Sequence, residues 1–302
     1  MSNRRNFIKQ VASLSAVGLI NPTELIASND SEHLCIMHTN DVHSHIEPFP
    51  SNHSKYPGMG GVAKRAKLIN KIRSEVEHTL LLDAGDMFQG TPYFNYYGGE
   101  VEFKLMNAMK YDAATIGNHD FDNGVDGLAK QVTNAKFKLL SANYNFENTP
   151  MKGLTKPYHI FNKGKFKIGV FGLGIELNGL VDPKMFGKTI YKDPIKEAQN
   201  LTQFLRKSKA CNLIICLSHL GLEYSTNKIS DKVLAKHCPE IDIILGGHTH
   251  TFLEKPIEIY SNIGKATYIS QVGWAGIKLG RIDVHIKNNT KTLIIKGQNN
   301  AI

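Results

Sequence analysis

Five short clusters in the sequence carry residue types that bind transition-metal ions. They occupy residues 39–43, 83–86, 117–122, 218–219 and 246–250. Between them they offer carboxylates, imidazoles and an amide. Mixed nitrogen and oxygen ligands suit Mn, Fe, Zn or Co better than Ca, which prefers oxygen ligands alone. The chemistry expected is that of a centre with two divalent metal ions (Mn, Fe, Zn, Mg or Co).

The spacing of the candidate ligands suggests how they share two ions. Asp41 and His43 are two residues apart, so both can reach one ion from a turn. Asp86 has two carboxylate oxygens and can bridge two ions. The other candidate ligands are one amide and three imidazoles: Asn118, His219, His248 and His250. Glycines beside them permit tight turns and close approach of the backbone.

Each cluster has a simpler interpretation when it is taken alone. Asp-x-His is more often a capped turn, Gly-Asp is a turn, and a single His219 is a hydrogen-bonded core histidine. Gly-Asn-His-Asp and Gly-His-x-His are more specific patterns. The five clusters occur together in this order, each after an apolar strand, and this combination favours the metal interpretation.

The elements that must position these clusters are short apolar strands. Buried strands are predicted at residues 34–37, 79–83, 113–116, 138–141, 166–171, 212–217 and 241–245. Helical spacing is found at residues 62–76, 100–109, 124–135, 194–207 and 231–237. In open α/β sheets, ligands bind beyond the carboxyl ends of the strands. Because each cluster follows a strand, one fold can bring all five together.

The pattern changes after the last cluster. Residues 256–260, 266–272, 278–286 and 291–296 alternate as antiparallel strands do, with Asn-Asn-Thr predicted to turn the last pair. We find no internal repeat and no linker rich in Pro, Gly or Ser. The folded part of the chain is therefore predicted to be one α/β domain that ends in a run of antiparallel strands.

Composition excludes several other protein classes. The chain has 302 residues, of which 41% are hydrophobic and 21% charged, which argues against disorder. Four cysteines are too few for a disulfide scaffold. Cys35 and Cys216 lie in apolar runs and are predicted to be buried thiols, whereas the pairing of Cys211 and Cys238 stays open. No apolar run is long enough to cross a membrane.

The first 27 residues have the character of an export signal. Arg4 and Arg5 precede Phe-Ile-Lys and a mildly apolar stretch, a pattern that resembles a twin-arginine signal. The alternative is a frayed amphipathic N-terminus. Removal of this segment lowers the net charge from +9 to +7, since it holds three basic residues and one acidic residue. The surplus either steers anionic substrates or is a solvated lysine surface. We expect an exported, periplasmic protein, with its folded domain at residues 28–302.

Together the clusters resemble the blocks of the calcineurin-like metallophosphoesterases: D-x-H, G-D, G-N-H-D/E, H and G-H-x-H. Within that superfamily the chain is most similar to the catalytic domain of the 5′-nucleotidase and UDP-sugar hydrolase family. The narrower similarity rests on N-D-V-H-S at 40–44, G-G-V-A-K-R at 60–65, D-A-G-D-M-F-Q-G-T-P at 83–92 and G-N-H-D-F-D at 117–122. It covers about residues 33–297.

The resemblance implies a fold and two sets of metal ligands. The fold class is α/β (α+β), a four-layer αββα sandwich in a single domain. One metal site would use Asp41, His43, Asp86 and His250. The second would use Asp86, Asn118, His219 and His248. Family members vary at the position that matches His250.

The resemblance also implies a mechanism. Two ions about 3.5–4 Å apart would hold the reacting oxygens while a metal-bound hydroxide attacks phosphorus directly. His119 would stabilise the transition state or protonate the leaving oxygen, and Asp122 would orient it; the alternative for Asp122 is a helix N-cap. Asn118 and His119 are also possible phosphate contacts. Asp120 is expected to support the structure or to hold a neighbouring ligand in place, and His45 to be exposed.

The sequence departs from the family beyond the catalytic domain. The second, C-terminal domain of the family is expected to be absent from this chain. A separate protein could dock and supply that domain. Otherwise the enzyme could act alone on a range of phosphomonoesters, or it could use a related ester such as a cyclic nucleotide. A Tyr-rich loop at 92–97 would line the substrate mouth or a partner surface, or simply pack on the domain. A small-molecule phosphate ester, with a nucleotide favoured, is the expected substrate.

Three other readings compete with the phosphomonoesterase. They are a phosphodiesterase or nuclease, a sulfur-ester hydrolase, and a metal-binding scaffold subunit that needs a separate substrate-binding partner. The lysines are scattered rather than arranged in a stripe with aromatic residues, so stable nucleic-acid binding is not expected. Six further histidines are expected on the surface or in packing roles: His33, His53, His78, His159, His237 and His285.

Overall fold

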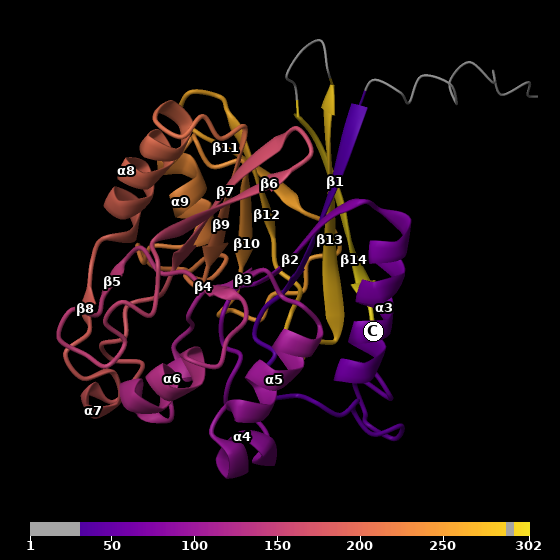
Figure 1. Cartoon of the computed structure of the whole chain (residues 1–302), viewed down its shortest axis with the longest axis vertical. Coiled ribbons are helices and arrows are strands. Elements are labelled where there is room, and N and C mark those ends of the chain that lie inside the picture. Colours follow the sequence, from indigo (N-terminus) through magenta and orange to yellow (C-terminus); the bar gives the residue numbers. More distant parts are fainter. Residues whose placement is uncertain (1–30, 288–292) are drawn as a thin grey trace, which may run out of the picture.

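The computed structural model describes residues 31–287 and 293–302. In it two six-stranded sheets pack face to face, with helices outside both (Figure 1). The first sheet has the order β14-β13-β1-β2-β3-β4, and the second has the order β11-β12-β10-β9-β7-β6. The strands of the first sheet are β1 (Ser31–Thr39), β2 (His78–Asp83), β3 (Ala113–Ala114), β4 (Lys138–Leu139), β13 (Lys278–Lys287) and β14 (Leu293–Ala301).

The second sheet and the helices complete the layers. The strands of the second sheet are β6 (Tyr158–Lys163), β7 (Phe166–Leu173), β9 (Leu213–Ser218), β10 (Ile243–Gly246), β11 (Ile257–Tyr260) and β12 (Ala266–Ser270). A separate two-stranded sheet pairs β5 (Tyr144–Asn145) with β8 (Ile190–Tyr191). The helices are α3 (Val62–Glu75), α4 (Pro92–Tyr97), α5 (Glu100–Ala108), α6 (Gly124–Val132), α7 (Pro183–Phe186), α8 (Pro194–Lys207), α9 (Asp231–His237) and the 3-10 turn η1 (His119–Phe121).

Three separate hydrophobic cores lie between the layers. Leu34 and Ile36 of β1 belong to the core between the two sheets, whereas Cys35 and Met37 belong to the core beneath α3, α5 and α6. A third core joins the outer face of the second sheet to α8 and α9. Side chains alternate across a strand, so a strand buried on both faces has a continuous apolar sequence. This arrangement confirms the predicted four-layer αββα sandwich.

The strands that precede the five clusters run in parallel within their own sheets. β1, β2 and β3 pair in parallel in the first sheet, and β9 and β10 pair in parallel in the second. Their carboxyl ends therefore lie at one edge of each sheet. The two edges meet across the sandwich, where the loops that carry the clusters come together.

The prediction for the last four strands is wrong in part. β11 and β12 pair antiparallel as predicted, but they belong to the second sheet, where β12 also pairs with β10 in parallel. β13 and β14 are antiparallel, but they belong to the first sheet, because β13 pairs with β1. Alternation shows that a strand has two different faces but does not identify its neighbour. The predicted Asn-Asn-Thr turn and the export segment lie outside the described residues.

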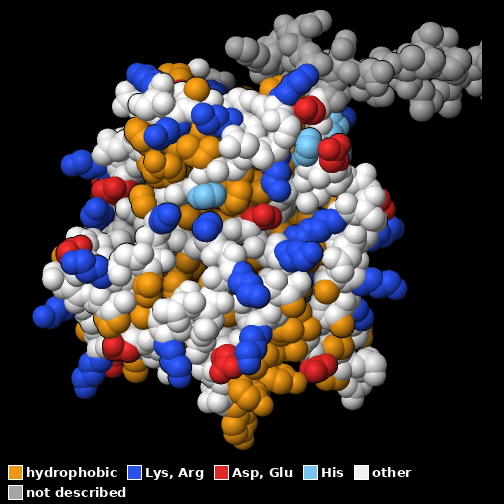
Figure 2. All heavy atoms as spheres, in the orientation of Figure 1, with side chains coloured by type: hydrophobic (Ala, Val, Ile, Leu, Met, Phe, Trp, Pro, Cys, Tyr) orange, Lys and Arg blue, Asp and Glu red, His pale blue; other side chains and the backbone are white. Residues whose placement is uncertain are grey.

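The segment predicted as a Tyr-rich loop is helix α4. Pro92 occupies its first turn, where the missing N–H costs nothing, and Gly98 ends it in a left-handed conformation. Tyr96 is 84% exposed and Tyr97 is 53% exposed. Figure 2 shows hydrophobic side chains projecting at the lower end of the molecule, where Figure 1 places α4.

Basic side chains are scattered over the surface seen in Figure 2, and the cysteines are unpaired. Lys and Arg side chains are spread over the face shown in Figure 2 and form no stripe there. All four cysteines are buried free thiols, so Cys211 and Cys238 are not paired. No helix in the described part of the chain has the length and apolar character that a membrane span requires.

Candidate metal centre

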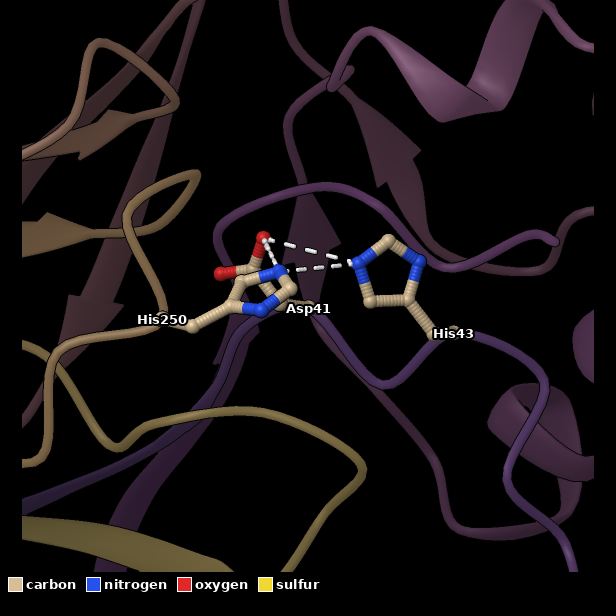
Figure 3. Close-up of side chains that lie close together, drawn as sticks. All are labelled: Asp41, His43 and His250. Carbon is tan, nitrogen blue, oxygen red and sulfur yellow. Dashed lines mark hydrogen bonds and ion pairs between the residues drawn. The ribbon is translucent and has the colours of Figure 1, made fainter. Parts of the chain in front are cut away.

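The first group of predicted ligands joins the loops after β1 and β10 (Figure 3). Nε2 of His43 lies 3.0 Å from Nε2 of His250, and Oδ1 of Asp41 lies 3.3 Å from the same atom of His250. Asp41 and His43 are buried, whereas the side chain of His250 is 39% exposed. Nδ1 of His43 donates to the carbonyl of Phe88 (3.2 Å), which leaves its Nε2 with a lone pair toward the group.

The second group consists of Asp86, His219 and His248. His219 is fully buried, and its Nδ1 donates to the carbonyl of Ala84 (2.7 Å), so Nε2 faces the group. The backbone N–H of His248 donates to both carboxylate oxygens of Asp41 at 3.0 Å. Nδ1 of His248 lies 2.8 Å from Oδ1 of Asn118, which brings the predicted amide ligand beside this group.

Asp86 lies between the two groups. Its Oδ2 is 3.0 Å from Nε2 of His219 in the second group and 3.7 Å from Nε2 of His43 in the first. Its Oδ1 accepts the backbone N–H of His119 at 2.8 Å. A carboxylate in this position has the reach that a bridging ligand needs.

The donor atoms fit divalent metal ions. Within each group the donor atoms all lie within 4.8 Å of one another. Nε2 of His219 is buried and, among the described residues, has no hydrogen-bond partner, because its close contact with Asp86 is not aligned for one. Nε2 of His43 and Nε2 of His250 face each other at a distance that two lone pairs avoid unless a proton or metal ion lies near. A cation at each group would satisfy these atoms.

The surroundings set the charge of the imidazoles. Burial lowers the pKa of His43, and it lowers that of His248 to about 4, so both rings are neutral near pH 7. Burial acts the same way on His219, but Asp86 and Asp41 outweigh it and raise its pKa to about 10 in the metal-free protein. A metal ion that binds here therefore displaces a proton from His219.

Five of the predicted ligands share an unusual backbone conformation. They have positive φ angles: Asp41 (49°), His43 (49°), Asp86 (55°), His248 (72°) and His250 (51°). Non-glycine residues rarely adopt such angles, and the cost of about 1–3 kcal/mol each persists only where the surroundings enforce it. The residue types do not predict this backbone strain, which is concentrated at the candidate ligands.

His119 and Asp122 form a pair beside Asn118. Nδ1 of His119 lies 2.8 Å from Oδ2 of Asp122, and this hydrogen bond raises the pKa of His119. The ring of His119 meets that of His43 edge-on, with centroids 5.2 Å apart. Asn123, not Asp122, occupies the N-cap position of α6, so the alternative reading of Asp122 as that cap is wrong.

Asp120 supports the loop that carries Asp86. Its buried carboxylate accepts four backbone N–H groups, those of Asp86 (3.1 Å), Met87 (2.9 Å), Phe88 (3.2 Å) and Gly117 (2.8 Å). These bonds tie the loop after β2 to the loop after β3. Asp120 thus supports the structure, as the sequence suggests, and does so by joining two of the five clusters.

Sequence reasoning missed the segment after β12. Nε2 of Gln271 donates to the carbonyl of Gly247 (2.6 Å), and Oε1 of Gln271 accepts the N–H of Thr251 (2.5 Å). Nδ2 of Asn40 donates to Oδ2 of Asp41 (2.6 Å). A signal for Gln271 was present, because this polar residue directly follows an apolar strand as the five clusters do.

Among the histidines with a predicted surface or packing role, one differs from its prediction. His45 is half-buried, not exposed, because it stacks on Phe49 and meets Trp274 edge-on. Within the described part of the chain, none of the six histidines assigned to surface or packing roles joins either group of candidate ligands. His33 instead pairs with Asp283 at 2.7 Å.

Comparisons with known proteins agree with this geometry. The family model described as calcineurin-like phosphoesterase matches residues 35–252. The chain is 34% identical to the snake venom 5′-nucleotidase of Crotalus adamanteus over 89% of this chain and 47% of that protein. It is 33% identical to the 5′-nucleotidase of Vibrio cholerae over 94% of this chain and 54% of that protein.

A solved structure gives the same result. The 5′-nucleotidase precursor from Thermus thermophilus superposes with a TM-score of 0.81 at 32% identity, over 89% of this chain and 54% of that one. The chain thus spans about half the length of these relatives. The resemblance inferred from the five clusters is confirmed, and the chain belongs to the calcineurin-like phosphoesterase family of phosphoric ester hydrolases.

Proposed function

We propose that this protein is a dinuclear metal-dependent phosphohydrolase that acts on phosphomonoesters, with nucleoside 5′-phosphates as the favoured substrates. The observation that carries the proposal is the position of Asp86 between two groups of donor atoms. The first group has the carboxylate of Asp41 and two imidazoles, and the second has two imidazoles of its own. The names of the similar proteins, 5′-nucleotidases from a snake and a bacterium, support the nucleotide class.

The proposed ligands divide between two ions. Asp41, His43, Asp86 and His250 would hold one; Asp86, Asn118, His219 and His248 would hold the other. When bound, the ions would supply Lewis-acid activation of water and neutralise charge on the phosphate. We propose Mn or Fe as the natural metals, because an exported protein that folds in the cytoplasm can load them before Zn competes.

His119 is the proposed proton donor to the leaving oxygen. Asp122 holds its Nδ1, which fixes the tautomer and keeps the ring in one orientation. The hydrogen bond to Asp122 raises the pKa of His119, so a proton is available near neutral pH. With a side chain that is 40% exposed, His119 can reach a bound substrate.

One assay panel tests the proposal. The purified protein, loaded in turn with Mn, Mg, Zn or Co, is offered AMP, UMP, UDP-glucose, 2′,3′-cyclic AMP, bis(p-nitrophenyl) phosphate and single-stranded DNA. Release of phosphate from AMP that is lost in Asn118→Ala is the expected result. Cleavage of DNA but not AMP would instead make it a nuclease. No turnover of any phosphate ester with any metal would contradict the proposal and leave the sulfur-ester hydrolase and the scaffold subunit as candidates.

We also propose that residues 1–27 direct export by the twin-arginine route and that residues 28–302 form the folded domain. The Thermus relative is described as a precursor, which supports export. A fusion of residues 1–27 to a fluorescent protein should reach the periplasm. Replacement of Arg4 and Arg5 by Lys should keep the fusion in the cytoplasm, and export of that variant would contradict the proposed route.

A further inference from the structure

His250 differs from His43 and His219 in what orients its ring. A ligand imidazole normally forms a hydrogen bond through the nitrogen that faces away from the metal. His219 does so with Ala84, and His43 with Phe88. Within residues 31–287 and 293–302, no group forms a hydrogen bond with Nδ1 of His250, whereas its Nε2 contacts His43 and Asp41. This imidazole, whose side chain is 39% exposed, therefore needs another restraint.

Trp274 supplies a flat surface against that ring. The indole lies parallel to the imidazole of His250, with an angle of 6° between the planes and 5.8 Å between the centroids. Three further rings pack against the indole at steep angles: His45 (5.3 Å), Phe49 (5.9 Å) and Tyr56 (6.5 Å). Trp274 is thus the centre of an aromatic cluster whose inner side is His250.

The backbone on each side of Trp274 is tied to the ligand loops. The carbonyl of Gly273 accepts a hydrogen bond from Asn40 (2.7 Å), and its N–H donates to the carbonyl of Thr251 (2.9 Å). The N–H of Ala275 donates to the carbonyl of Asp41 (2.7 Å). The indole is therefore anchored to both chain segments that supply the first group of ligands.

We propose that Trp274 is a positioning residue that fixes the ring plane of His250, so that Nε2 points to Asp41 and His43. Ring packing does here what a hydrogen bond through Nδ1 does for His43 and His219. The inference rests on the proposed function, because it takes His250 as a metal ligand. It predicts that loss of the indole weakens one of the two metal sites and leaves the other unchanged.

Trp274 also provides the readout, because it is the only tryptophan in the sequence. Emission of an indole changes when an adjacent imidazole binds a metal ion. In protein freed of metal with a chelator, titration with Mn²⁺ should therefore change the fluorescence in a single step that reports the site of His250. His250→Ala should abolish this step, whereas His219→Ala, which alters the other site, should retain it.

Metal binding by variants completes the test. Trp274→Ala should bind one Mn²⁺ about 10- to 100-fold more weakly and the second with wild-type affinity, measured by calorimetry and elemental analysis. Trp274→Phe should recover part of the loss, since a ring still packs on His250. Tyr260→Ala, which removes an exposed aromatic ring on β11, is the matched control and should bind both ions normally.

The outcomes separate this inference from the function on which it rests. If Trp274→Ala and Trp274→Phe bind both ions as the wild type does, the positioning role is wrong and the metal centre stands. If both sites weaken equally, Trp274 supports the fold in general and the inference is overturned. If the wild type binds no Mn²⁺, the proposed metal centre fails, and the inference fails with it. If the Trp274→Ala protein does not fold, metal binding by Trp274→Phe and the fluorescence titration of His250→Ala decide the question.

Discussion

Asp86 and His219 face each other across the two sheets, with Oδ2 of Asp86 3.0 Å from Nε2 of His219. Asp86 follows β2 of the first sheet, and His219 follows β9 of the second. The contact therefore joins the two halves of the sandwich at the point where their strands end. Both side chains are buried, so the charges of this pair must be balanced by a proton or a metal ion.

His119 should matter most for substrates with a poor leaving group. If it donates the proton to the leaving oxygen, His119→Asn should lower kcat for AMP by about 100- to 10,000-fold. The loss should be much smaller for p-nitrophenyl phosphate, whose leaving group needs no proton. Asp122→Asn should show the same selectivity at reduced size. Equal losses for both substrates would contradict proton donation, and Asp126→Asn on the neighbouring helix is the control.

Asp120 should be worth more to stability than an ordinary surface carboxylate. In Asp120→Asn the new amide N–H₂ group faces backbone donors, so at least one buried N–H loses its acceptor, at about 1–3 kcal/mol for each. Urea unfolding of the metal-free protein should report a lower free energy of unfolding by about that amount. A variant as stable as the wild type would show that the four hydrogen bonds are dispensable.

Arg65 should stabilise the buried polar groups that line one small cavity with it. Arg65, Asp83 and Glu102 are all buried, and they line a cavity of about 30 Å³. Nε and Nη1 of Arg65 and Oε2 of Glu102 find no partner among the described residues, so water in this cavity is expected to bridge them. Arg65→Leu removes these donors and leaves Oε2 of Glu102 beside an apolar side chain, which should cost about 1–3 kcal/mol in urea unfolding.

Two further variants test the contribution of Arg65 to stability. Lys67→Met alters an exposed cation on the same helix and should change stability little. Arg65→Leu combined with Glu102→Gln should lose less than the two single variants do together, because the double variant also removes the charge of the Glu102 carboxylate. Simple addition of the two losses would show that the charges do not interact.

His38 should make stability depend on pH. Complete burial lowers its pKa from 6.5 to about 3, and Nε2 makes a hydrogen bond of 2.9 Å with Oγ of Ser270. Between these pH values the unfolded chain binds a proton at His38 and the folded chain does not. Its contribution to stability is therefore present above pH 6.5 and is lost as the pH falls toward 3.

Removal of His38 tests this dependence. In His38→Gln, the slope of unfolding free energy against pH from 4 to 6 should be smaller than in the wild type by about 1.4 kcal/mol per pH unit. Urea unfolding at several pH values with a chelator present measures the slope. His237→Gln, an exposed histidine, is the matched control. Equal slopes in wild type and His38→Gln would exclude His38 as the source.

Local patterns in the sequence were enough to predict most of the elements and the candidate ligands. The alternation of Leu34, Cys35, Ile36 and Met37 has a local cause, since both faces of β1 are buried. Strand neighbours have a long-range cause, and this is why the parallel pairing of β12 with β10 was missed. The segment of Tyr96 and Tyr97 was predicted to be a loop, but it is helical.

Within the site, residue types were predictable and contacts were not. Asp41 and His43 stand in a recognisable motif, whereas Trp274 lies in the glycine-flanked run G-W-A-G, which has no metal-binding residue type. Only the fold brings its indole against His250. The positive φ angles of the candidate ligands likewise arise from the loops that enforce them, and the residue types carry no sign of them.

Anomalous scattering of Mn²⁺ in crystals of the loaded protein locates the metal ions themselves. A dinuclear centre predicts two peaks in each molecule, one contacted by Asp41, His43 and His250 and the other by Asn118, His219 and His248, with Asp86 in contact with both. A single peak, or two peaks with no shared Asp86, would contradict the dinuclear centre.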